Sequence, residues 1–293
     1  MNSVNVTIIE IVNFYDWLLN ISDSRVSDWL LMDAYWPTWG ITGFYLLSVY
    51  IGMWLMKNKI PFNLRNPLIF HNLLMIILNF HIFSQLLYHS WKLKYNYFCQ
   101  AVNADPDNLS ELKIASAIWW FYISKLVELL DTVFFVLRKK NDQVSFLHVY
   151  HHATMFPLWW IGVKWLPGGS AFLGPMINSF VHVVMYSYYG LTIFCPALRK
   201  FMVWKKYVTR LQLIQFIVGM IWGINLLVNG CVHIPKWMIY TGIVYGISMI
   251  SLFLNFYYRA YILKYRNLPR TDICNGHVEI MKNGSSNGHV KLL

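Results

Sequence analysis

Long apolar runs separated by short polar segments dominate the chain from residue 37 onward. Seven of these runs have about 20 residues, the length that an α-helix needs to cross roughly 30 Å of hydrocarbon. The runs lie at 37–56, 67–88, 115–137, 147–165, 169–194, 208–229 and 237–258. This pattern predicts an all-α integral membrane protein with seven transmembrane helices.

The composition supports a membrane location. Hydrophobic residues make up 57% of the 293 residues and charged residues only 13%, whereas about a quarter of a soluble domain is charged. We therefore expect one membrane domain at 37–262, a lumenal segment at 1–36 and a cytosolic, disordered tail at 263–293. No cleavable signal peptide is expected, because residues 1–30 lack a basic start.

Lysine and arginine gather in alternate loops. Loops rich in these residues follow the first, third, fifth and seventh apolar runs. Because positively charged loops stay on the cytosolic side of a membrane, the N-terminus is predicted to be lumenal and the C-terminus cytosolic. Topology and attraction to anionic lipid headgroups then explain the net charge of +11, and no nucleic acid is expected as a partner.

Two kinds of residue on the predicted lumenal side are candidates for covalent modification. Asn-x-Ser/Thr sites occur at Asn5, Asn20 and Asn108, which makes these asparagines candidates for glycosylation. Cys99 and Cys231 fall in lumenal loops, where disulfides persist. A disulfide between them is one expectation, and two free buried thiols are an alternative that the sequence leaves open.

The third apolar run carries polar groups on one side. About a third of the circumference of a helix holds Lys125, Glu128, Asp131 and Thr132. Ionisable residues inside a membrane are costly and indicate a functional site by default. Lys125 and Glu128, three residues apart, could instead neutralise each other for purely structural reasons, but Asp131 is not explained in this way.

The fourth run contains the segment FLHVYHHATM, with three histidines in five positions. On a helix, His148, His151 and His152 lie within about 100° of one another, and Tyr150 points away. The next two runs also carry polar stripes. These contain Asn178, His182, Tyr186 and Tyr189 in the fifth run and Thr209, Gln212 and Gln215 in the sixth.

Polar residues of the second run are interpreted differently. They are His71, Asn72, Asn79, His81 and Gln85. Single polar side chains commonly hold membrane helices together by hydrogen bonds. We therefore assign these residues to contacts between helices and not to the site.

The histidine cluster has three chemical interpretations. A di-iron lipid desaturase or hydroxylase needs about six protein ligands, and the chain offers one HxxHH box with one further histidine. A single zinc on His148, His152 and His182, with Asp131 behind them, also stays open. The favoured interpretation is acyl transfer without a metal, in which a buried neutral imidazole takes the acyl group and a second imidazole moves the proton.

Four segments resemble the signatures of the ELO family of very-long-chain fatty acid elongases. They are KLVELLDT (125–132), HVYHH (148–152), NSFVHVVMYSYYG (178–190) and TRLQLIQ (209–215), in the order and spacing of that family. The resemblance implies a fold in which transmembrane helices two to seven form two inverted three-helix halves. These halves are expected to surround an acyl tunnel that opens to the cytosol for CoA.

The resemblance also implies a function, that of a condensing enzyme of fatty acid elongation. Such a 3-ketoacyl-CoA synthase, an acyltransferase, joins a long-chain acyl-CoA to malonyl-CoA, releases CO2 and CoA and adds two carbons, without a cofactor. The expected partners are acyl-CoA, malonyl-CoA and membrane lipid, with a homodimer and other enzymes of the elongation cycle as candidates. A seven-helix transporter is a less favoured alternative, because the polar groups do not follow a continuous path.

Family roles can be assigned to matching positions. The resemblance makes His151 the nucleophile that receives the acyl chain and places His182 opposite it, with His148, His152 and Asp131 completing the catalytic set. The residues implied to bind or shape the substrate are Lys125, Glu128, Asn178, Tyr186, Tyr189, Gln212 and Gln215. Four basic residues are candidates for attracting the CoA phosphates, although topology also explains each of them: Lys139, Lys140, Lys205 and Lys206.

The resemblance implies residence in the endoplasmic reticulum membrane. Many members of the family end in a retrieval signal with two lysines. Here Lys291 has no lysine partner, because His289 and Val290 occupy the positions before it. The expected location therefore depends on the family resemblance and not on this signal.

Overall fold

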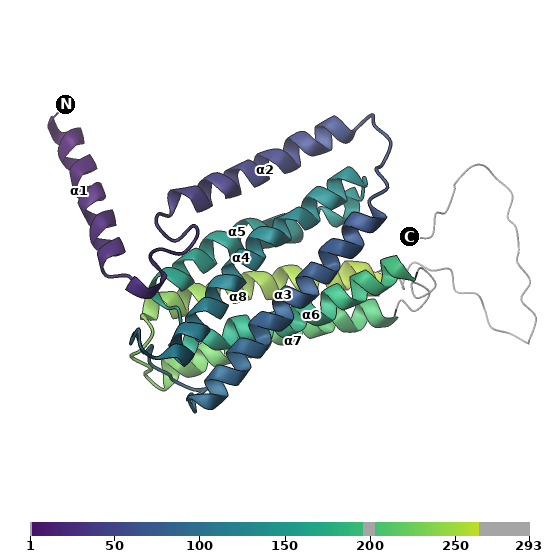
Figure 1. Ribbon diagram of the computed structural model, residues 1–293. Coiled ribbons are helices and arrows are strands. Elements are labelled where there is room, and N and C mark those ends of the chain that lie inside the picture. Colours follow the sequence, from purple (N-terminus) through teal and green to yellow (C-terminus); the bar gives the residue numbers. More distant parts are fainter. Residues whose placement is uncertain (1, 196–202, 264–293) are drawn as a thin grey trace, which may run out of the picture.

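The computed structural model describes residues 2–195 and 203–263 (Figure 1). Within these ranges the chain is all-helical, with no strand. The α-helices are α1 (Asn2–Asn20), α2 (Trp36–Met56), α3 (Arg65–Lys92), α4 (Leu109–Leu137), α5 (Phe146–Trp165), α6 (Leu173–Phe194), α7 (Val203–Val228) and α8 (Lys236–Tyr257). Short 3-10 turns lie at Ser24–Val26, Asn141–Gln143 and Gly169–Phe172, and a π-helical segment, Tyr258–Leu263, continues α8.

The helices α2 to α8 coincide with the seven predicted apolar runs. By length and composition, four of them are apolar enough to cross a membrane: α2, α3, α7, and α8 with its π-helical extension. The other three long helices, α4, α5 and α6, are those that carry the charged, histidine and tyrosine residues of the proposed site. The polar site therefore lowers the apolar character of the helices that hold it.

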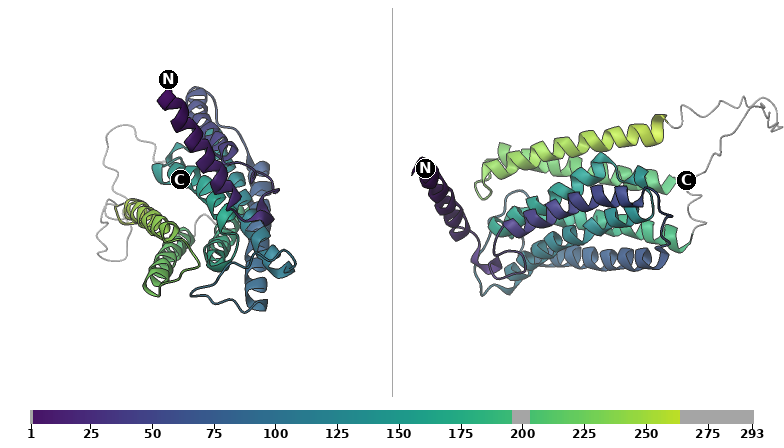
Figure 2. Two further views of the ribbon diagram at one scale, coloured as in Figure 1. Left: turned by 90° about the vertical axis from the view of Figure 1, so that its left-hand side faces the viewer. Right: turned by 90° about the horizontal axis from the view of Figure 1, so that it is seen from above.

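The segment predicted at 1–36 contains α1, a helix that the sequence analysis did not predict. Its sequence mixes apolar residues with Glu10 and Asp16, so it does not form an apolar run of membrane length. Phe14 and Trp17 are exposed on it, and the helix extends away from the bundle in Figures 1 and 2. A search for uninterrupted apolar runs does not detect a helix whose apolar residues recur only on one side.

Six helices form a closed ring. In their order of contact they are α3, α4, α5, α8, α7 and α6, and α6 packs along α3 to close the ring. α2 lies outside the ring against α4 and α5 and follows the upper edge of the bundle in Figure 1. Hydroxyl pairs join α2 to α4, with Thr38 bonded to Tyr122 at 2.8 Å and Tyr45 bonded to Thr132 at 2.9 Å.

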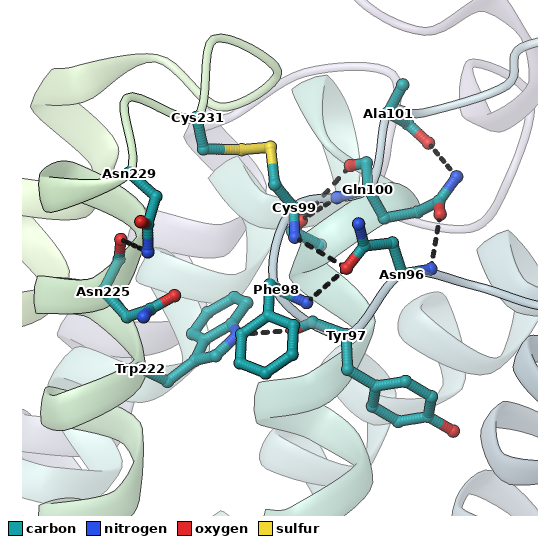
Figure 3. Close-up of a disulfide and its surroundings, with 11 residues drawn as sticks. Asn96, Tyr97, Phe98, Cys99, Gln100, Ala101, Trp222, Asn225, Asn229 and Cys231 are labelled. Carbon is teal, nitrogen blue, oxygen red and sulfur yellow. Dashed lines mark hydrogen bonds between the residues drawn. A yellow bond between two sulfur atoms is a disulfide. The ribbon is translucent and has the colours of Figure 1, made fainter.

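One end of the bundle, which we call the disulfide end, is tied by loops far apart in the sequence (Figure 3). Cys99, between α3 and α4, is bonded to Cys231, between α7 and α8, across 132 residues. The indole of Trp222 on α7 donates to the Tyr97 carbonyl at 2.9 Å. The α3–α4 loop is thereby joined to the α7–α8 pair at two neighbouring points.

The loop before α6 also packs against the α3–α4 loop. Ser170 N donates to the Gln100 carbonyl at 2.9 Å, and Gln100 N donates to Ser170 Oγ at 2.6 Å. Gly169 has a φ of +51°, and a Cβ atom there would lie 2.7 Å from the same carbonyl oxygen. Only glycine accommodates both the backbone conformation and the close approach. Nearby, burial and the hydrogen bond to Glu111 raise the pKa of Tyr95, which keeps this phenol a donor.

Loss of the disulfide is expected to reduce stability. Cys99→Ser removes a covalent link that closes a long loop, a change that typically costs about 2–4 kcal/mol. Thermal unfolding of the purified protein with and without reductant measures the effect. Reductant is expected to lower the unfolding midpoint of the wild type but not that of Cys99→Ser. Cys195→Ser, which alters an exposed free thiol, is the control, and equal sensitivity of all three proteins would contradict the expectation.

The opposite end of the bundle, which we call the basic end, contains the loops after α2 and α4. Lys139 Nζ donates to the carbonyls of Lys57 and Lys59, both at 2.9 Å, and so holds the α2–α3 loop against the end of α4. Arg65 begins α3, and its guanidinium donates to the Phe194 carbonyl at 3.3 Å. Most of the tail predicted at 263–293, together with Arg199 and Lys200, lies outside the described residues.

The three asparagines proposed as glycosylation sites differ in environment. Asn20 is exposed at the last residue of α1. Asn108 is partly buried, and its side-chain oxygen accepts from the amides of Ser110 and Glu111 as the N-cap of α4. The side chain of Asn5 is outside the described part of the structure. Glycosylation remains a prediction at each of them.

Candidate active site

A buried ion pair joins two of the predicted site residues on α4. Lys125 Nζ lies 2.7 Å from Glu128 Oε1, and both side chains are at most 1% exposed. The same ammonium donates to Asn178 Oδ1 on α6 at 2.9 Å. Lys125 therefore has a partner on α6 as well as on α4, so the ion pair is not only a charge neutralisation within α4.

Glu128 connects this pair to His182. His182 Nδ1 lies 3.0 Å from Glu128 Oε1, although the two groups are not oriented as a hydrogen bond. The second carboxylate oxygen of Glu128, Oε2, is buried and has no hydrogen-bond partner among the described residues. A buried charged oxygen without a partner is costly, so this atom is available to a polar group of a substrate or to a water.

Asp131, one turn further along α4, has partners on two other helices. Its Oδ1 lies 2.9 Å from His71 Nε2 on α3, and its Oδ2 accepts from the Tyr186 hydroxyl on α6 at 2.6 Å. His71 and Tyr186 are 3% and 1% exposed, whereas the side chain of Asp131 is 17% exposed. Both carboxylate oxygens are thus occupied by side chains that orient the group.

The histidine box lies at the start of α5. Ser145 is the N-cap of this helix, and its hydroxyl accepts from the amide of His148, which fixes the helix start next to the box. The ring centres of His148 and His152 are 4.3 Å apart, and those of His151 and His152 are 5.1 Å apart. The three imidazoles therefore form one cluster, as the helical spacing predicted.

The tyrosine within the box points elsewhere. The hydroxyl of Tyr150 bonds to Ser248 on α8 at 3.0 Å, and its ring stacks against Tyr245 of the same helix. Thr154, one turn later, bonds to the Tyr245 hydroxyl at 3.0 Å. These contacts close the α5–α8 side of the ring, and Tyr150 is separate from the histidine cluster.

Three predicted substrate residues lie outside these networks. The amide of Gln212 on α7 contacts Met185 Sδ at 3.2 Å. Tyr189 is 39% exposed and packs against Tyr188. The side chain of Gln215 makes no hydrogen bond within the described part of the chain. Their assignment to substrate binding remains a prediction.

Two residues of the network were missed by the sequence analysis. The sequence analysis assigned His71 to contacts between helices. In the structure His71 does bond from α3 to α4, but its partner is Asp131, a carboxylate of the proposed site. Tyr45 on α2 was not considered, and it reaches His148 through Thr132. The assignment was wrong for Asn72 and Asn79, which donate to carbonyls of their own helix. The sequence shows only that each of these residues is polar and lies in an apolar helix. This observation does not tell whether the side chain bonds to another helix or to a carbonyl of its own helix.

The polar side chains of α3, α4 and α6 around the histidine cluster bond mainly to one another. No group of three or more His, Cys, Asp or Glu residues in the described ranges is arranged to hold a metal ion. His148 Nε2 faces the hydroxyl of Thr132, and His71 Nε2 faces Asp131. The arrangement brings imidazoles, the buried Lys125 amine and an unpartnered carboxylate oxygen of Glu128 together in one place.

Apolar helices around buried histidines, carboxylates and a lysine define a multi-pass membrane protein with an internal polar site. Comparison with known sequences gives the particular family. The sequence model of the ELO (GNS1/SUR4) family matches residues 30–267, and the chain belongs to this family. Three of the four segments that resemble the family signatures, 125–132, 148–152 and 178–190, contribute most residues of the Glu128 and Asp131 networks and the histidine cluster. His71 lies outside these segments.

Individual relatives are similar over most of their length. Very long chain fatty acid elongase 4 of Homo sapiens is 52% identical over 261 residues, which are 89% of this chain and 82% of the relative. The elongase 4 of Macaca mulatta is 49% identical over 295 residues, covering 100% and 92%. Elongase 5 of Homo sapiens is 42% identical over 279 residues, covering 94% and 90%. These matches do not favour a desaturase, a hydroxylase or a transporter.

Proposed function

We propose that this protein is the condensing enzyme of fatty acid elongation, a very-long-chain 3-oxoacyl-CoA synthase. Membership of the ELO family over residues 30–267 carries the proposal, and relatives named very long chain fatty acid elongases support it. The reaction joins acyl-CoA to malonyl-CoA, needs no cofactor and yields 3-ketoacyl-CoA, CO2 and CoA. The similarity of VSFLHVYHHATMFPLWWIGVKW (144–165) to the animal elongase 4 type agrees with the relatives found.

The proposed membrane arrangement has α2 to α8 as seven spans. The disulfide end is lumenal, because disulfides persist there, and the basic end is cytosolic, because lysine and arginine stay on that side. The ring order of α3, α4, α5, α8, α7 and α6 is consistent with two inverted halves, α3–α5 and α6–α8, around an acyl tunnel. We propose the endoplasmic reticulum as the location from the family alone, with a homodimer and other enzymes of the cycle as candidate partners.

The proposed reaction has two half-reactions. In the first, a nitrogen of His151 attacks the thioester carbon of acyl-CoA, the carbon–sulfur bond breaks, and CoA leaves with the imidazole proton. In the second, malonyl-CoA loses CO2, the resulting enolate carbon attacks the carbonyl carbon of the acyl-imidazole, the carbon–nitrogen bond breaks, and His151 leaves with a proton taken up from solvent. Covalent catalysis by an imidazole divides one difficult step into two easier ones.

The networks of α4 would serve both half-reactions. Lys125 and Asn178 place a cation and an amide beside Glu128, and His182 lies next to the same carboxylate. Asp131 holds the Tyr186 phenol and the His71 imidazole in fixed positions. A pre-oriented set of donors and acceptors stabilises charge that develops on thioester or enolate oxygens.

A direct assay tests the proposed function. The purified protein is mixed with long-chain acyl-CoA and malonyl-CoA, and the products are separated by mass. The expected product is a 3-ketoacyl-CoA with two more carbons, accompanied by CO2 and free CoA. Unsaturated or hydroxylated acyl-CoA of unchanged length would contradict the proposal. A series of acyl lengths then defines substrate preference.

The proposed binding region for the CoA phosphates is at the basic end. A cavity of about 470 Å³ there is lined by the α2–α3 loop and the ends of α4 and α6, including Arg65, Arg138 and Lys140. Lys139, which the sequence analysis also considered, donates instead to two loop carbonyls. Cations around a cavity attract the phosphates of CoA, and the cavity lies at the end of α4 beyond Asp131.

We expect the double variant Arg65→Gln with Lys140→Gln to weaken acyl-CoA binding. The KM for acyl-CoA should rise about 5–20-fold while kcat changes little, because the lost contacts act equally on substrate and transition state. An acyl-pantetheine thioester, which lacks the nucleotide phosphates, should show no change in KM. Lys92→Gln at the other end of α3 is the control. An equal rise in KM for both substrates would contradict phosphate binding.

A further inference from the structure

A chain of hydroxyl groups leads from outside the helix ring to the histidine box. It begins at Tyr45 on α2, which is 3% exposed. The Tyr45 hydroxyl lies 2.9 Å from Thr132 Oγ1 on α4, and this oxygen lies 2.8 Å from His148 Nε2 on α5. Thr132 is fully buried. The chain joins three helices and is separate from the carboxylate network of Asp131.

The hydrogen bonds of this chain have one satisfactory direction. Each hydroxyl has a single hydrogen to donate. If Thr132 donated to Tyr45, the Tyr45 hydrogen would need another acceptor, and the described residues provide this hydroxyl with no partner except Thr132. A buried donor without an acceptor costs about 1–3 kcal/mol. The arrangement that satisfies both hydroxyls is donation from Tyr45 to Thr132 and from Thr132 to His148.

We propose that Tyr45 is a positioning residue that sets the tautomer of His148 through Thr132. His148 Nε2 accepts the Thr132 hydrogen bond, so the proton of the neutral ring is on Nδ1, because the bond made by one ring nitrogen determines the state of the other. His148 then offers an N–H to its surroundings, and its Nε2 lone pair is occupied. This inference rests on the proposed condensing function, in which His148 belongs to the catalytic cluster.

The proposed tautomer of His148 gives the histidines different roles in proton transfer. The ring of His152 lies 4.3 Å from that of His148, and the ring of His151 lies 5.1 Å from that of His152. With His148 held as a donor, the proton that leaves His151 during acylation goes to His152, to His182 or to the CoA sulfur. Tyr45 thereby prevents the neighbouring imidazole from competing as a second base.

The structure contains a matched control for Tyr45. Tyr122 and Thr38 form the same kind of hydroxyl pair between α2 and α4, at 2.8 Å, and their hydrogen bond does not continue to a histidine. Tyr45→Phe and Tyr122→Phe each remove one phenolic oxygen from this helix interface. If Tyr45 only holds α2 against α4, the two variants should behave alike. If it sets the tautomer of His148, only Tyr45→Phe should alter the catalytic step.

Steady-state condensation by the full-length protein tests the proposal. Tyr45→Phe is expected to lower kcat on the order of 10- to 100-fold, the range lost when a hydrogen-bond partner that orients a histidine is removed, and to leave KM for acyl-CoA within about twofold. Tyr122→Phe should keep the kcat of the wild type. Thermal unfolding of both variants separates a catalytic effect from a loss of folded protein.

Variants of Thr132 provide a second measurement. Thr132→Val removes the middle of the chain, so it should lower kcat as Tyr45→Phe does, and adding Tyr45→Phe to it should cause little further loss. Thr132→Ser, which keeps a hydroxyl, should retain more activity than Thr132→Val. The proposal is overturned if Tyr45→Phe leaves kcat unchanged, or if the two tyrosine variants lower it equally. An inactive wild-type protein would instead contradict the proposed function.

Discussion

Incubation of the purified protein with long-chain acyl-CoA alone is expected to produce a covalent acyl adduct on His151 and free CoA, before malonyl-CoA is added. His151, the proposed acyl acceptor, belongs to a compact cluster at the start of α5, with His152 beside it. His151→Ala removes the nucleophile, and condensation should fall by at least about 10³-fold. Intact-mass measurement and peptide mapping identify the adduct and its position.

His81→Ala is the control for this experiment. His81 is an exposed histidine on α3, away from the histidine box, and its replacement should leave both the adduct and the condensation rate unchanged. If the wild type releases CoA only after malonyl-CoA is added, the two-step mechanism is wrong, while the elongase function is unaffected. An adduct on another histidine would reassign the nucleophile within the cluster.

Breaking the buried pair of Lys125 and Glu128 is expected to have the largest effect on stability. Glu128→Gln leaves the Lys125 ammonium, which is 1% exposed, with the Asn178 carbonyl but no carboxylate. Removal of one partner from a buried ion pair typically costs about 3–5 kcal/mol, because the remaining charge is uncompensated. Thermal unfolding in detergent measures the loss, and condensation activity should fall with it.

A second substitution separates the electrostatic cost from other effects. In the double variant Lys125→Met with Glu128→Gln, no charge remains unpaired, so most of the stability should return while activity stays low. Lys59→Met, which alters an exposed lysine, should change stability by less than about 0.5 kcal/mol. If Glu128→Gln is as stable as the wild type, the pair is not the electrostatic centre that its burial indicates.

The histidine box shows which features of the site the sequence pattern can predict. The spacing of His148, His151 and His152 predicted one cluster and turned Tyr150 away from it, and the structure has both features. These are properties of a single helix, and the geometry of an α-helix relates them directly to residue numbers. The same pattern could not show that Thr132, on another helix, holds His148.

The polar residues of α3 show what the sequence pattern could not predict, namely the partner of each side chain. His71, Asn72 and Asn79 have similar surroundings in the sequence, and all three were assigned to contacts between helices. In the structure, His71 bonds to Asp131 on α4, while the two asparagines donate to carbonyls of α3 itself. The difference depends on the rotation and register of α3 against α4 and α6, which the hydrophobic pattern of α3 alone does not specify.

The sequence by itself determined the membrane character, the positions of α2 to α8, and the faces of α4 and α5 that carry polar groups. It could do so because hydrocarbon requires long apolar helices, and helical periodicity assigns each residue a direction. The tertiary structure alone decided that His71 and Tyr186 share Asp131, and that Tyr45 from outside the ring reaches His148 through Thr132. These contacts join helices far apart in the chain, so they depend on how whole helices pack.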